Sequence, residues 1–155
     1  MSNQCTRCKT QPGFHTFDVL GQNGHGDVIY YTAPGKNIEP QFTEESVANY
    51  LSHMDSTAGH TWVWIFDATG LEKVDMPNPA LMRRFYKSIV QRYDTSLKYI
   101  YMLHMNWKVE AIYNIIKTFS SADVKRRVIV IKHPIELIAA GIPTSIIEKV
   151  LPIKT

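Results

Sequence analysis

Cysteine is scarce in this chain and confined to one end of it. Of 155 residues only two are cysteines, Cys5 and Cys8, and both lie in a polar N-terminal segment. They therefore cannot supply a disulfide framework for a domain of this size. No apolar run approaches the roughly 18 residues of a membrane-spanning helix, and no basic leader with a long apolar stretch opens the chain. We expect a cytoplasmic protein, with peripheral contact to membranes left open.

A large excess of charge of one sign is also missing. The chain carries 17 Lys and Arg against 14 Asp and Glu, so its formal net charge is only +3. The basic residues are spread through the sequence and form no long block. Such a balance suits an anionic membrane surface, but it does not argue for nucleic acid. We therefore expect no nucleic-acid partner.

Signatures of catalysis and of cofactor binding are absent as well. Gly21, Gly24 and Gly26 do not form a dinucleotide fingerprint, because that motif must follow a strand and open a helix. Asp67 has no Ser-His pair or second carboxylate at a recognisable spacing. We therefore predict a protein that is not an enzyme and needs no cofactor.

The N-terminal segment contains only the beginning of a metal-binding pattern. Cys5 and Cys8 are spaced to chelate one ion, and His15 and His25 follow, but a second cysteine pair is missing. We therefore assign no metal here, and we interpret residues 1–15 as a flexible tail that precedes a single domain at residues 16–155.

The stretch "HTWVWIFDATG" at residues 60–70 has a nearly unbroken apolar run before an aspartate. Such a run predicts a strand at Thr61–Phe66 that is covered on both faces of a sheet. Alternation along that strand puts Trp62, Trp64 and Phe66 on one face. Asp67 follows at the carboxyl end, where ligands often bind in open α/β sheets. We expect Asp67 to hold the following loop by accepting backbone N–H bonds.

Strand and helix patterns alternate along the rest of the chain. Further strands are predicted at Val28–Tyr31, after a hairpin-like start, and at Leu97–His104 and Arg126–Lys132. Two helices are predicted to begin after Thr43 and Asn78, and a third is predicted at residues 109–119. Two further short helices are predicted to begin at Pro134 and Pro143. This order predicts an α/β fold, a mainly parallel sheet with helices packed on it.

These segments, taken in order, resemble the CRAL-TRIO family of lipid-binding domains from about Gly24 to Pro152. "VWIFDATG" is similar to the family's strand ending in Asp-x-x-Gly, and "VQRYDTSLKYIYMLHMN" to its helix, strand and Asn. "IYNIIKTFSSADVKRRVIVIK" is similar to its helix, basic residue and strand, and "ELIAAGIPTSIIEKVLP" to its closing Leu-Pro region. The resemblance implies a sheet roofed by helices around an apolar cavity, without the N-terminal helical module of many members.

The implied function is non-enzymatic binding of a hydrophobic ligand, a phospholipid or another lipid, with transfer or presentation at a membrane. A helix drawn from residues 132–150 would open and close the cavity at the bilayer. Arg127 matches a basic position that meets head-group phosphates in the family's phosphatidylinositol-transfer members. The ligand-binding residues that we predict are Trp62, Trp64, Phe66, Tyr99, Tyr101, Arg127, Ile138 and Ile142.

The sequence diverges from the phosphatidylinositol binders at one motif and leaves an alternative open. Those proteins carry Tyr-Pro-Glu-Arg where this chain has Tyr93-Asp94-Thr95-Ser96. "AAGIPTSIIEKV" resembles the Leu-Gly-Ile-Pro ending of a second branch, whose members bind proteins as much as lipids. The alternative function is therefore a protein scaffold, with a small GTPase or its regulator as partner and an empty or vestigial pocket. The sequence also resembles STAS domains, though less closely, and Thr69 would then be the residue that is phosphorylated. The number of predicted strands does not fit the STAS fold.

Overall fold

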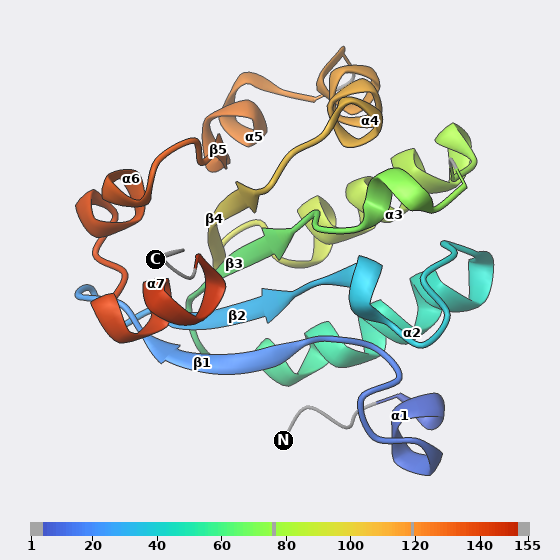
Figure 1. The fold of residues 1–155 in the computed structure, drawn as a ribbon, viewed down its shortest axis with the longest axis horizontal. Coiled ribbons are helices and arrows are strands. Elements are labelled where there is room, and N and C mark those ends of the chain that lie inside the picture. The colour runs from blue at the N-terminus through green and yellow to red at the C-terminus, as the bar shows by residue number, and fades with distance from the viewer. Residues whose placement is uncertain (1–4, 76, 119, 152–155) are drawn as a thin grey trace.

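One five-stranded sheet organises the chain, and its strands lie side by side in chain order (Figure 1). The structure, a computed structural model, describes residues 5–75, 77–118 and 120–151. β1 pairs antiparallel with β2, whereas β2 to β5 run parallel. This arrangement confirms the predicted α/β fold with a mainly parallel sheet. The strands are β1 (Asp18–Gln22), β2 (Val28–Thr32), β3 (Trp62–Asp67), β4 (Leu97–Leu103) and β5 (Val128–Val130).

The helices begin where the sequence provides caps. The Thr43 side chain accepts from the Ser46 backbone N–H at the start of one helix, and the Asn78 side chain accepts from the Ala80 N–H at the start of another. Prolines open two later helices, as predicted. The expected helix at 109–119 is present, although Phe119 itself lies outside the described residues. The helices are α1 (Thr6–Thr10), α2 (Glu44–Met54), α3 (Pro79–Arg92), α4 (Trp107–Thr118), α5 (Ala122–Arg127), α6 (Pro134–Ala139) and α7 (Thr144–Val150).

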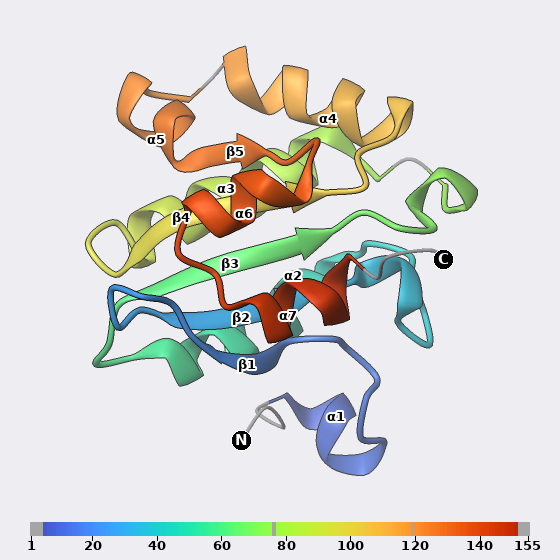
Figure 2. The same ribbon diagram turned by 60° about the vertical axis from the view of Figure 1, so that its left-hand side comes forward.

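Each face of the sheet has its own apolar core. Trp62 and Trp64 of β3 pack with α2 and α3 on one face, which we call the α3 face. Val63 and Ile65 pack on the other face with Leu137 of α6 and residues of α7. Figure 2 shows α6 and α7 crossing back over the sheet after β5. The alternation predicted for β3 is therefore confirmed, and the strand is buried on both sides.

Four residues of the segment 5–15, for which the sequence predicts a flexible tail, are buried: Cys5, Cys8, Phe14 and His15. Cys5 and Cys8 are only 2% and 1% exposed. Arg7 Nε donates to Glu45 Oε1 of α2 at 2.7 Å. The segment is polar in sequence, but it gains partners from a helix some forty residues further along the chain. The placement of the domain boundary after residue 15 stays a prediction.

Two turns that approach each other closely yield a test of the fold. A Cβ atom on Gly35 would overlap with the carbonyl oxygen of Thr69 in the turn after β3. We expect Gly35→Ala to lower the free energy of unfolding by about 1–3 kcal/mol, because backbone must shift to admit the methyl group. Gly24→Ala is the control, since its nearest contact would be 3.9 Å away. Urea unfolding measures both, and equal losses would contradict the close approach.

Candidate functional site

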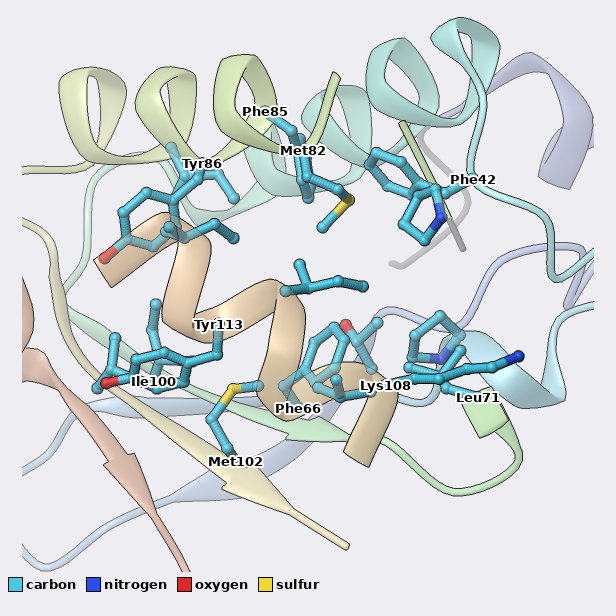
Figure 3. A pocket seen from close by; sticks show the side chains of 18 of the residues that line it. Phe42, Phe66, Leu71, Met82, Phe85, Tyr86, Ile100, Met102, Lys108 and Tyr113 are labelled. Atoms are coloured by element: carbon cyan, nitrogen blue, oxygen red, sulfur yellow. The ribbon is translucent and has the colours of Figure 1, made fainter. Parts of the chain in front are cut away.

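An apolar pocket lies on the α3 face of the sheet, between the strands and helices α3 and α4 (Figure 3). About 1270 Å³ within it is free of protein atoms, the open mouth included. The main wall residues are apolar or aromatic: Phe42, Trp64, Phe66, Met82, Phe85, Tyr86, Ile100, Met102, Ile112, Tyr113 and Ile116.

The wall formed by α4 is packed differently from the rest. Helices α2 and α3 bury aromatic and aliphatic side chains directly against the sheet. Of the 12 described residues of α4, only Val109 is buried. Ile112 and Ile116 lie one turn apart on the helix side that lines the pocket, as their i, i+4 spacing requires. The pocket therefore occupies the space that α4 leaves above the strands.

Polar groups in the floor and back of the pocket are bonded to one another. Trp64 Nε1 donates to Thr32 Oγ1 at 2.9 Å, and Asn37 Nδ2 donates to the Tyr50 hydroxyl at 2.5 Å. Burial raises the pKa of Tyr50 to about 12, so its hydroxyl is neutral at physiological pH. These groups offer no free charge to a ligand, and the interior of the pocket is suited to hydrocarbon.

Charged groups occur at the two ends of the pocket. Near its start α4 carries Lys108, whose Nζ donates to the Val74 carbonyl oxygen at 2.8 Å. At the connection to α5, Lys117, Ser120 and Lys125 line the pocket. Burial raises the pKa of Tyr86 nearby, which keeps this hydroxyl neutral. The end at the α4–α5 connection, which we call the basic end, therefore carries two ammonium groups.

Asp67 holds the turn after β3, as the sequence predicts. Its carboxylate accepts from the Thr69 N–H at 2.9 Å and the Thr69 hydroxyl at 2.5 Å. The Tyr31 hydroxyl donates to its other oxygen at 2.6 Å. Burial raises the pKa of Tyr31, with Asp67 adding to the effect. All these contacts fix local structure, and Asp67 is 2% exposed.

Three of the residues predicted to bind ligand lie on the α3 face. Trp64 and Phe66 line the pocket. Trp62 is fully buried further back, where its ring contacts those of Tyr30 and Tyr93. Contact of any of the three with a bound ligand stays a prediction.

Tyr99 and Tyr101 belong to the opposite face of the sheet. The pairing of β3 with β4 shifts between Trp62 and Val63, so that Tyr99 lies opposite Val63 and Tyr101 opposite Ile65. Tyr101 is buried in the core under α6 and α7, and Tyr99 stacks on it with 43% of its surface exposed. Aromatic content alone suggested that both could line a pocket, but the register between strands decides their face. Met102, next along β4, lines the pocket instead.

Arg127 is engaged in ion pairs beside the sheet. Its guanidinium donates to Asp123 Oδ2 at 2.7 Å and to the Asp94 carbonyl oxygen at 2.6 Å. Lys125, two residues earlier, is the member of the Lys125-Arg126-Arg127 cluster that lines the pocket. The sequence indicated the cluster, but the turn of α5 determines which side chain faces the cavity.

Ile138 and Ile142 lie on the face of the sheet opposite the pocket, with α6 and α7. Ile142 is buried in the core there, and Ile138 is 56% exposed to solvent. The segment at residues 132–150 therefore lies on the face opposite this pocket, and its role as a lid stays a prediction. The sequence shows that these short helices are apolar, but it does not show which side of the sheet the chain crosses after β5.

Several pocket residues outside the predicted set come from α3 and α4. Phe85 and Ile112 occur at helical spacing, which predicts an apolar helix face packed on the core. Apolar residues recur at helical spacing both in a helix that packs directly on a sheet and in one that lines a pocket above it. No local signal distinguishes the two cases.

Comparison with known proteins agrees with this architecture. The family model described as CRAL/TRIO domain matches residues 17–151. The chain belongs to the CRAL/TRIO family. The crystal structure of Sfh5 superposes with a TM-score of 0.53 at 15% identity, over 82% of this chain and 50% of that one. This likeness shows the shared fold.

A curated relative is the Rho GTPase-activating protein 68F of Drosophila melanogaster. It is 21% identical over 120 residues, which are 77% of this chain and 25% of that protein. The chain thus spans about a quarter of the length of this relative. Among the described residues, no helix is both long and apolar enough to cross a bilayer.

The two isoleucines opposite the pocket yield a second test. We expect Ile142→Asp to lower the free energy of unfolding by about 3 kcal/mol or more, because it places a charge in a dry core. Ile138→Asp, at an exposed position of the neighbouring helix, should change it by about 0.5 kcal/mol or less. Urea midpoints decide between these outcomes. Slower lipid transfer by Ile138→Asp at unchanged stability would support the prediction that a helix from residues 132–150 moves during transfer.

Proposed function

We propose that the pocket between the sheet, α3 and α4 binds one lipid or other hydrophobic molecule, without catalysing a reaction, and presents or transfers it at a membrane. The observation that carries the proposal is an open pocket with apolar walls in a CRAL/TRIO fold. Each buried CH₂ group of a ligand contributes about 0.8 kcal/mol, so an acyl chain alone supplies useful affinity.

Helix α4 is the wall that we propose to move when the ligand enters and leaves. Its start is anchored to the turns that follow β3, because Asn106 Nδ2 donates to the Ala68 carbonyl and Lys108 Nζ to the Val74 carbonyl. Beyond Val109 none of the described residues of α4 is buried, so little apolar contact opposes its displacement. Trp107, at its start, is 69% exposed and suits the membrane–water interface.

Filling the pocket from α4 tests ligand binding. We expect Ile112→Trp to weaken uptake of a labelled phospholipid from vesicles about tenfold or more, because displacing two or three buried CH₂ groups costs about 2 kcal/mol. Ile115→Trp is the matched control, since Ile115 is an exposed isoleucine on the same helix. Native mass spectrometry of the gently purified proteins gives the lipid content of each variant.

The test compares lipid uptake by Ile112→Trp with lipid uptake by Ile115→Trp. Their melting temperatures are compared first, so that misfolding is not mistaken for a blocked pocket. Equal lipid uptake by both variants, at equal stability, would contradict binding in this pocket.

The basic end favours a ligand with an anionic head group at the α4–α5 connection. Lys117 and Lys125 are exposed enough to exchange water for a phosphate, and Ser120 adds a hydroxyl between them. Arg127 contributes as a positioning residue, because its bonds to the carbonyl oxygen and carboxylate of Asp94 hold α5 beside the end of α3. Together these groups support binding of an anionic phospholipid in preference to a zwitterionic one.

Charge reversal at the basic end tests this preference. We expect Lys117→Glu with Lys125→Glu to reduce uptake of anionic phospholipid about tenfold while leaving zwitterionic lipid nearly unchanged, since each surface cation contributes about 1 kcal/mol. Lys132→Glu with Lys149→Glu, outside the pocket, changes net charge equally and serves as control. If uptake of anionic phospholipid falls equally in both double variants, general attraction to the vesicle explains the preference and the assigned head-group site is wrong.

The alternative function, a protein scaffold that binds a small GTPase or its regulator, is supported by the relative described above. That relative is named as a Rho GTPase-activating protein, and it matches this chain over 120 residues. Purified Rho-type GTPase and titration calorimetry give a direct test. Binding of the GTPase by a protein that contains no lipid and takes none from vesicles would favour the scaffold over the lipid carrier.

A further inference from the structure

A cluster of two cysteines and two histidines joins the N-terminal segment to α2. Cys5 and Cys8 come from the start of the chain, His15 from the loop before β1, and His53 from the last turn of α2. The four side chains are 2%, 1%, 6% and 1% exposed, respectively. One ligand atom from each lies within 4.8 Å of all the others. Figure 1 shows α1, which carries Cys8, outside the β1 edge of the sheet.

The distances between these atoms match a tetrahedral metal site. Cys5 Sγ and Cys8 Sγ lie 3.4 Å and 3.7 Å from His15 Nδ1, and Cys8 Sγ lies 3.4 Å from His53 Nε2. Zinc bonds of about 2.3 Å to sulfur and 2.0–2.1 Å to nitrogen, at tetrahedral angles, would place sulfur and nitrogen about 3.5 Å apart. The three sulfur–nitrogen distances are close to that value, and every other pair of these atoms lies within 4.8 Å.

The backbone around the cluster is arranged to accept negative sulfur. The Cys8 N–H donates to Cys5 Sγ at 3.3 Å, and the His15 N–H donates to Cys8 Sγ at 3.3 Å. Such bonds favour thiolates over thiols. Two cysteines that served only as apolar core would not need two imidazoles and two N–H groups directed at their sulfurs.

We propose that Cys5, Cys8, His15 and His53 bind one zinc ion as a closed Cys₂His₂ site. Four protein ligands leave no position for water or substrate, so the site is structural. Its effect is to connect residues 5–15 to α2, because His15 and His53 are 38 positions apart in the sequence. The sequence had suggested His25 as a companion of Cys5 and Cys8, but His25 lies in the exposed β1–β2 turn. His53 takes its place because α2 is packed beside the N-terminal segment.

Metal analysis of the full chain, purified with reductant and without chelator, tests the site. We expect about one zinc per chain in the wild type and in the control His25→Gln, and at least a fivefold lower content in Cys8→Ser and His53→Gln. Wild-type protein with no zinc, or with a Cys5–Cys8 disulfide or iron in its place, would overturn the proposal. This readout is independent of lipid binding, so the two proposals fail separately.

A second measurement covers the case in which the ligand variants do not fold. Reduced wild-type protein, stripped of metal, is titrated with Co²⁺. We expect the visible absorption of tetrahedral cobalt with a thiolate charge-transfer band, both lost on addition of Zn²⁺. Removal of zinc should also lower Tm by roughly 5–10 °C, reversibly. Absence of the cobalt bands in protein that keeps its fold would overturn the site; if stripped protein unfolds, the zinc content of the untreated wild type decides.

Discussion

Burial of β3 on both of its faces is the constraint on which the other parts of this structure depend. Trp62 and Trp64 face one core, whereas Val63 and Ile65 face the other, and all four are nearly inaccessible to water. A central strand of this kind must have a neighbour on each edge and a helical layer on each face. β2 and β4 pair with its two edges. Helices α2 and α3 cover one face, and α6 and α7 cover the other. The pocket can open on one face because the other is sealed.

The pocket exists because the helical layer on the α3 face is only partly closed. α2 and α3 pack directly on the strands, and their aromatic side chains fill the space beneath them. α4 is held mainly at its start, through Asn106 and Lys108, and its remaining turns stand away from the strands. The bulky floor residues Trp64 and Phe66 thus face a cavity in place of a helix. Loose packing of one helix therefore leaves the space that forms the pocket.

The Cys₂His₂ cluster extends the domain beyond the sheet and connects to the pocket wall. His15 and His53 both lie against Tyr50, with ring centroids 5.2 Å and 6.4 Å away. Tyr50 in turn lines the pocket. Buried polar groups need partners, and one metal ion would bind all four side chains at once. A zinc ion would thus stabilise both the N-terminal segment and α2, the helix that carries Tyr50.

The sequence by itself determined most of the strands and longer helices of this fold and the alternation along β3, although it did not predict α1 or α5. Strand runs, the caps at Thr43 and Asn78, and the Asp67 turn are local patterns, and local physics governs them. Only the tertiary structure decided what depends on distant contacts. It set the register that turns Tyr101 away from the pocket, and it set the face that α6 and α7 cover. It also brought His53 to Cys5 and Cys8. The register, the covered face and the position of His53 all depend on contacts between segments far apart in sequence. Such contacts produce no periodic pattern in the sequence from which they could be predicted.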